Sequence, residues 1–117
     1  MTPAQMLEMA RQVLTGDDLH VGGNRSVVAA VLARRALEGT LDEFWDTHLP
    51  GMAACSSRVQ LITLPFYLGD KDLAAEACYA WSALSASCHH AVNALPVSPN
   101  EMTHLVAIVQ AVIDSGP

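Results

Sequence analysis

The chain has 117 residues, a formal net charge of −6 and a composition that is 51% hydrophobic but only 5% aromatic. A chain of this length usually builds one hydrophobic core, so we expect a single domain over residues 1–117. None of its six basic residues follows Lys71, so the clustered cationic surface that a phosphate backbone requires is not expected across the later part of the chain. This distribution argues against nucleic-acid binding.

The N-terminal segment and the cysteines indicate the compartment. The segment MTPAQMLEMARQ has no basic region followed by an apolar run, so it does not resemble a secretory signal. The apolar stretch VVAAVLA at residues 27–33 is too short to span a bilayer. Cys55, Cys78 and Cys88 lack zinc-site spacing and indicate reduced thiols. We therefore expect a cytoplasmic location, with no membrane span, no metal and no cofactor.

Capping signals divide the first half of the chain. The segment TPAQ at residues 2–5 predicts the start of a helix that ends near Gly16. The turn-rich segment TGDDLHVGG at residues 15–23 predicts a loop. A second, long helix is expected to follow a cap at Asn24 and to end at the segment HLPG, residues 48–51.

A third helix is expected in the run SRVQLITLPFYLG, residues 57–69, which is almost wholly apolar. Ser57 begins it, with Gln60 at the position that would close a capping box. An apolar circumference is typical of a segment enclosed by others. Pro65 lacks a backbone N–H and is therefore expected to kink this helix.

Two more capping signals follow. Asp70 predicts a fourth helix that extends to about Leu95, and the segment SPNE at residues 98–101 forms a second full capping box that opens a fifth helix. No repeat, low-complexity tract or linker divides the chain. The sequence thus predicts an all-α domain, a bundle of four or five helices.

The fourth helix is notable for its lack of charge, since no charged side chain occurs between Glu76 and Glu101. Its core stripe recurs at helical spacing and consists of Leu73, Ala77, Trp81, Leu84, Cys88, Val92 and Leu95. Because a helix low in charge on all sides is usually covered on all sides, it is either central in the bundle or covered by a second copy. We expect a homodimer. The predicted interface consists of Tyr79, Ala83, Ala86, His90 and Asn93.

The adjacent His89 and His90 raise the question of chemistry. Neighbouring helical residues diverge by about 100°, so these two and Cys88 do not readily converge on a metal ion. An acid–base role needs a carboxylate or a hydroxyl nucleophile, and no GxSxG turn exposes one of the nearby serines. The other interpretation of His89 is a hydrogen bond to a serine or a backbone carbonyl. Cys88 is expected to be a buried, unreactive thiol.

Two tryptophans and an ion pair complete the candidates. Trp45 and Trp81 are core residues by position, and they are also candidates to line a ligand cavity, because helical bundles build sites between facing helices. Glu38 lies about one helical turn from both Arg34 and Arg35, which predicts an exposed ion pair with one of them on a solvated face.

Three segments carry a family resemblance: ARRALEGTLDEFW (33–45), YAWSALSASCHHAVNAL (79–95) and PVSPNEMTHLVAIVQAVI (96–113). With them, residues 29–113 resemble the HEPN superfamily of small helical domains. The resemblance implies a HEPN-like bundle that dimerises, with His90 at the place of the family's histidine. Family members with ribonuclease activity carry an arginine shortly before that histidine, and this sequence has no cation there.

Three functional hypotheses follow. The first is a non-enzymatic, homodimeric helical domain that binds a protein partner or a small ligand. The alternative, implied by the resemblance, is a divergent metal-independent ribonuclease of a toxin–antitoxin or defence system, with His90, His89 and Arg58 as catalytic residues. The third is a small-molecule enzyme with His89 or His90 as a base. Because phosphoryl transfer depends on stabilising developing charge, the missing arginine favours the binding domain.

Overall fold

The computed structural model describes residues 1–16, 25–88 and 97–115, and these residues form helices without any strand. The elements in chain order are α1 (Pro3–Thr15), α2 (Arg25–His48), the 3-10 helix η2 (Met52–Ala54), α3 (Ser57–Thr63), the 3-10 helix η3 (Leu64–Phe66), α4 (Lys71–Cys88) and α5 (Pro99–Asp114). The predicted all-α helical bundle is therefore confirmed for the described residues.

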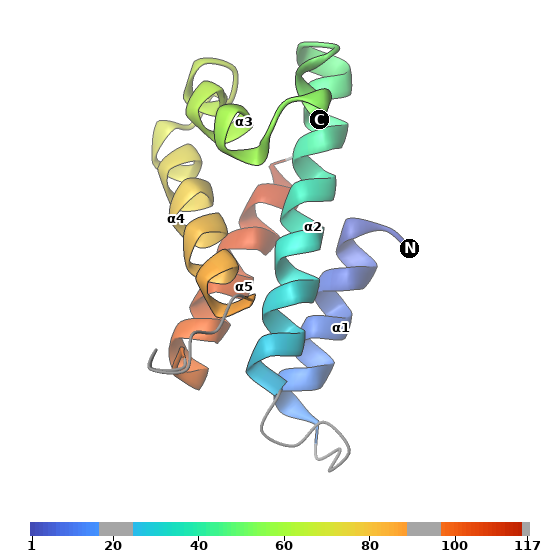
Figure 1. Ribbon diagram of the computed structural model, residues 1–117, viewed down its shortest axis with the longest axis vertical. Coiled ribbons are helices and arrows are strands. Elements are labelled where there is room, and N and C mark those ends of the chain that lie inside the picture. The colour runs from blue at the N-terminus through green and yellow to red at the C-terminus, as the bar shows by residue number, and fades with distance from the viewer. Residues whose placement is uncertain (17–24, 89–96, 116–117) are drawn as a thin grey trace.

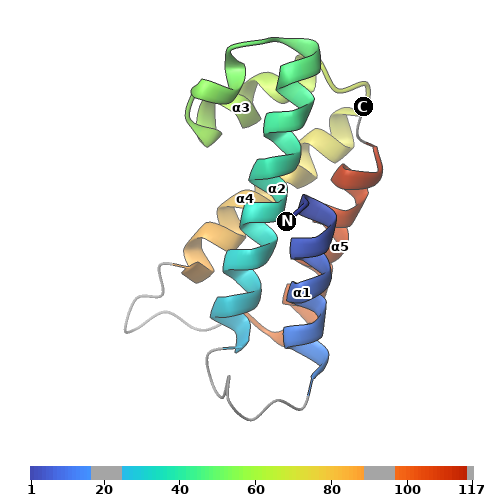
Figure 2. The ribbon, with the colours of Figure 1, turned by 90° about the vertical axis from the view of Figure 1, so that its right-hand side faces the viewer.

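Helix α2 is the central element of the bundle. It packs against α1, α4 and α5, while the short α3 lies beside the upper end of α4 (Figures 1 and 2). The alternative that the fourth helix is central does not hold for the described part of the chain, because α4 leaves one side exposed. That exposed side includes the uncharged residues Ala75, Tyr79, Ser82 and Ala86.

Alanines fill much of the buried faces of the central helix and of α4. The alanines of α2 at positions 29, 30, 33 and 36 and those of α4 at positions 74, 77 and 80 are all at most 1% exposed. Small side chains allow helix axes to approach closely, and alanine is also the residue with the highest helix propensity. The buried stripe of α4 is accordingly richer in alanine than predicted, and Leu73, Trp81 and Cys88 lie half-buried at its edges.

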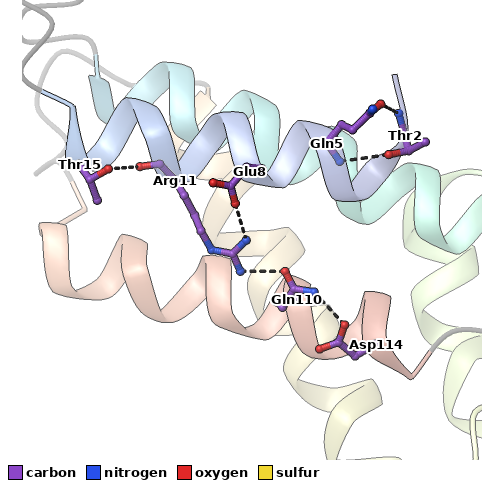
Figure 3. Close-up of polar contacts among 7 residues, drawn as sticks. All are labelled: Thr2, Gln5, Glu8, Arg11, Thr15, Gln110 and Asp114. Atoms are coloured by element: carbon purple, nitrogen blue, oxygen red, sulfur yellow. Dashed lines mark hydrogen bonds and ion pairs between the residues drawn. The ribbon is translucent and has the colours of Figure 1, made fainter.

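The caps explain where α1 and α5 begin. The Gln5 amide donates to the Thr2 hydroxyl at 3.1 Å and the Gln5 side chain accepts from the Thr2 amide at 2.8 Å, which confirms the capping box (Figure 3). At α5 the Glu101 amide donates to Ser98 Oγ at 3.1 Å. The Glu101 carboxylate accepts from the Tyr79 hydroxyl instead of completing the second box.

Helix α3 differs from the prediction at both ends. Its N-cap is Ser56, whose hydroxyl accepts from the Val59 amide, so Ser57 is the first helical residue and not the cap. The side chain of Gln60 is buried and donates to the Ala53 and Cys55 carbonyls, which ties α3 to the preceding turn. The α-helix ends at Thr63 rather than kinking at Pro65, because proline cannot donate to the carbonyl four residues back.

Candidate binding groove

A groove of about 390 Å³ lies between α3 and α4, within the size range of small-molecule sites. Its lining consists of Arg58, Leu61 and Ile62 from α3 and Cys78, Trp81 and Ser82 from α4. Each helix contributes residues at the spacing i, i+3 and i+4, which places three side chains on one face of a helix. Two short faces of neighbouring helices therefore form the walls.

The walls of the groove are mainly apolar. Leu61 is 3% exposed and continuous with the core, whereas Ile62 is 62% exposed and forms the outer edge. Trp81 is half-buried and packs against the core from the α4 side. An apolar group entering the groove would thus meet one fixed aliphatic wall and one aromatic wall.

A polar cluster on α2 holds Trp81 in place. The indole N–H of Trp81 donates to Glu38 Oε2 at 3.2 Å, and the hydroxyl of Ser57 donates to the same oxygen at 3.2 Å. The guanidinium of Arg34 completes the cluster, with Nε 3.7 Å from that oxygen. The predicted Arg34–Glu38 pair is present, but the expectation of a solvated pair is wrong, since the two side chains are only 28% and 30% exposed. Helices α3 and α4 cover it.

Arg58 has no such partner. The structure records no hydrogen bond or ion pair for its guanidinium among the described residues. The carboxylate of Glu38, which accepts from Ser57 beside Arg58 in the chain, is already engaged by Trp81 and Arg34. Arg58 itself is exposed and lines the groove.

The cysteines differ sharply in exposure. Cys78 is exposed and lines the groove, and Cys55 is exposed in the turn before α3. Cys88 is half-buried, and burial raises the pKa of its thiol, against the smaller opposing effect of the Arg34 guanidinium. Since the thiolate is the reactive form, the raised pKa agrees with an inert thiol at position 88.

An exposed apolar ridge runs along α3 and η3 beside the groove. Val59, Ile62 and Phe66 are 44%, 62% and 82% exposed. The expectation that the third helix is enclosed by other elements is therefore wrong. Because α3 lies at one end of the bundle, only its inner side, with Leu61 and Gln60, is covered.

The remaining predicted site residues are placed as follows. Trp45 is fully buried, with its ring edge-on to those of Phe44 and Tyr67 at centroid distances of 5.0 and 5.4 Å, so it is a core residue away from the groove. Of the two tryptophans, Trp81 alone lines the groove.

The predicted dimer interface lies partly within the described residues. Tyr79 is 48% exposed, Ala86 is exposed, and Ala83 is half-buried against the core. The hydrogen bond from Tyr79 to Glu101 directs this side chain toward α5, and this bond is also the main reason that the pKa of Tyr79 is raised. His89, His90 and Asn93 lie outside the described residues.

A second groove, between α1 and α5, provides a contrast. It has a volume of about 220 Å³ and is lined by Arg11, Leu14, Thr15, Thr103, Val106 and Ala107. Its arginine is engaged: Arg11 donates to Gln110 at 2.8 Å and lies 3.4 Å from Glu8 (Figure 3). The side chain of Gln110 in turn donates to Asp114 at 2.8 Å. This cation connects two helices.

Within the described residues, no group of three or more histidine, cysteine, aspartate or glutamate side chains is arranged to hold a metal ion. The described helices include none with the length and apolar character needed to cross a membrane. No protein-family model, curated protein or solved structure matches the chain. The HEPN-like resemblance stays a prediction.

Proposed function

We propose that this chain is a non-enzymatic helical binding domain that holds the apolar group of a small ligand in the groove between α3 and α4. The observation that carries the proposal is the combination of an open groove, two apolar walls and a tryptophan already oriented by Glu38. A wall that is fixed before binding reduces the ordering cost of complex formation.

The chemistry of the lining supports binding without turnover. Among the described residues, its only titratable side chains are Arg58 and Cys78, and its only hydroxyl belongs to Ser82. A serine or cysteine nucleophile requires an adjacent base, and the described residues of the lining include no histidine, aspartate, glutamate or lysine. The groove therefore supplies apolar contact and positive charge but no acid–base pair.

The proposal includes the homodimer. Tyr79 and Ala86 are exposed on the side of α4 that turns toward α5, and Tyr79 is rotated by about 100° around the helix from Cys78 in the groove. Ser82 lies on this uncharged side and also lines the groove, so the proposed dimer surface and the groove adjoin along α4. A second copy seated on Tyr79 and Ala86 would leave the groove open toward α3, because the other lining residues lie outside that surface.

The groove is tested by the reactivity of Cys78 in Cys55→Ser protein. Peptide mass spectrometry follows the rate at which a thiol reagent modifies Cys78, with octan-1-ol added as a neutral apolar probe. We expect octan-1-ol to slow the modification, because a probe lying against Trp81 and Leu61 covers the thiol. If neither octan-1-ol nor its charged analogues octanoate and octylammonium slow the modification of Cys78, the proposed function is wrong.

A matched pair of variants locates the effect. Ile62 lines the groove and Val59 lies one turn earlier on the exposed ridge, and both are β-branched, exposed residues of α3. Ile62→Asp should abolish the protection of Cys78, whereas Val59→Asp should leave it intact. Equal effects of the two substitutions would assign the protection to the ridge rather than to the groove.

The ribonuclease alternative makes a different prediction. If it holds, His90→Ala abolishes RNA cleavage and Arg58→Ala severely reduces it, with histidine moving the proton and arginine stabilising the phosphate charge. Arg58 lies beside residues 78–82 of α4, before the end of the described helix at Cys88. Purified wild-type protein that leaves RNA intact would rule against this alternative.

A further inference from the structure

We propose that the ligand of the α3–α4 groove is an apolar carboxylate, with its anionic head bound by Arg58 and its apolar body lying against Trp81, Leu61 and Ile62. This inference rests on the proposed binding function and adds the chemical class of the ligand. It makes Arg58 the residue that determines specificity.

The charge of the ligand follows from the pairing of the arginines. The chain has twelve acidic and six basic side chains, so an arginine has acidic partners in excess. Arg11 and Arg34 each lie within 4 Å of a glutamate, at 3.4 and 3.7 Å. Arg35 and Arg58 have no recorded acidic partner among the described residues, and of these two only Arg58 lines an apolar groove. An anion brought by the ligand would supply the missing partner.

The number of cations distinguishes a carboxylate from a phosphate. Phosphate sites in proteins usually combine several cationic side chains with backbone amides or a helix N-terminus. Within the described part of the chain, Arg58 is the only cation that lines this groove, and its guanidinium matches a carboxylate in a bidentate geometry. Because a single guanidinium balances a single negative charge, the groove favours a monoanion over a polyanion such as RNA.

The apolar character of the ligand's body follows from the scarcity of polar groups in the walls of the groove. The indole N–H of Trp81 is used by Glu38, so the ring presents only its hydrocarbon surface to the groove. Leu61 and Ile62 add no polar group, which leaves Ser82 and Cys78 as weak polar contacts along α4. A ligand with polar groups along its body would lose hydrogen bonds to water without replacing them.

The test compares three probes that share an eight-carbon chain: octanoate, octan-1-ol and octylammonium. Each is titrated into Cys55→Ser protein while the modification rate of Cys78 is measured. A hydrogen-bonded ion pair in a partly apolar groove should lower the half-protecting concentration of octanoate about tenfold relative to octan-1-ol. Octylammonium should protect least, because its charge repels Arg58.

Variants assign the preference to one side chain. Arg58→Gln should reduce the protection of Cys78 by octanoate to the level given by octan-1-ol, and it should leave the protection by octan-1-ol unchanged. Arg35 is an exposed cation outside the lining. Arg35→Gln makes the same change in net charge as Arg58→Gln and should keep the tenfold preference for octanoate. Thermal unfolding confirms that both variants are folded.

The outcomes separate the two proposals. If octan-1-ol protects Cys78 and octanoate is no better, or if Arg58→Gln keeps the octanoate preference, the carboxylate assignment is wrong and the groove remains a binding site. If none of the three probes protects Cys78, the proposed function fails, and the ligand class fails with it.

Discussion

The groove between α3 and α4 and the groove between α1 and α5 have similar parts but differ in how their arginine is paired. Each lies between neighbouring helices and contains one arginine above a buried aliphatic side chain, Leu61 in one and Val106 in the other. Arg11 is held by Glu8 and Gln110 and so joins α1 to α5, whereas Arg58 has no recorded partner. An arginine whose partner is supplied by the fold stabilises the fold, and one without a partner is available to a ligand.

The largest expected effect on stability comes from Leu61, in the aliphatic wall of the α3–α4 groove. Leu61→Ala should lower the free energy of unfolding by about 2–4 kcal/mol, because it leaves a cavity at a side chain that is 3% exposed. Leu14→Ala, in the other groove, removes a half-buried side chain and should cost clearly less. Urea denaturation monitored by circular dichroism measures both, and equal losses would contradict the assignment of Leu61 to the core.

The next effect concerns the uncharged side of α4 next to the groove. If the proposed dimer forms there, Ala86→Glu should convert it to a monomer without unfolding it, because the substitution buries an unpaired charge in the proposed interface. Native mass spectrometry of the purified protein, before and after the substitution, reads the change directly. An unchanged mass would refute this interface, and Cys78 protection should persist in the variant if binding and dimerisation use different sides.

The comparison of the two arginines gives a smaller difference in stability. Arg11→Ala removes a 2.8 Å hydrogen bond that links α1 to α5 and should cost about 1 kcal/mol. Arg58→Ala removes no recorded bond and should change stability by less than about 0.5 kcal/mol. Thermal and chemical unfolding test the pair together. If Arg58→Ala is the more destabilising substitution, the guanidinium of Arg58 is structural and the proposed contrast is lost.

The smallest expected effect is at Asp42, on the exposed side of α2. Burial raises the pKa of this carboxyl, and Asp46 and Glu38 raise it further, against the hydrogen bond from Gln60, which lowers it. A raised native pKa means that the folded state binds the proton more tightly, so stability is lost as the pH rises through the native pKa.

Asp42→Asn should therefore stabilise the protein at neutral pH by a few tenths of a kcal/mol, a small value because the residue is exposed and screened by solvent. The gain should vanish below the ordinary aspartate pKa of 3.8, where the wild-type carboxyl is protonated in both states. Unfolding curves at neutral and acidic pH measure the difference. A gain that persists at low pH would point to a cause other than the charge.

Local signals predicted the starts of α1 and α5 well, because a cap depends on residues within one turn of each other. The Thr2 and Ser98 caps, and the end of α2 at His48, fall where the capping pattern placed them. Local signals failed at α3, where Ser56 and Ser57 are equivalent by type. Ser57 uses its hydroxyl to contact Glu38 on α2, nineteen positions away, and this contact has no local signature.

The candidate site was predictable in its members but not in its arrangement. Arg58 and Trp81 were both candidate residues, one through a family resemblance and one as a tryptophan between helices. Their position in one groove depends on how α3 packs beside α4. The role of Glu38 was missed, because its spacing from Arg34 predicts an ordinary ion pair on a solvated face.

Alone, the sequence determined the helical character, the starts of α1 and α5 and the end of α2, because propensity and capping act over a few residues. Only the tertiary structure decided which helix is central, which arginine is paired and which faces stay exposed. Those outcomes depend on contacts between residues far apart in the chain, such as Glu38 with Trp81 and Arg11 with Gln110. The contrast between the two grooves arises from such contacts.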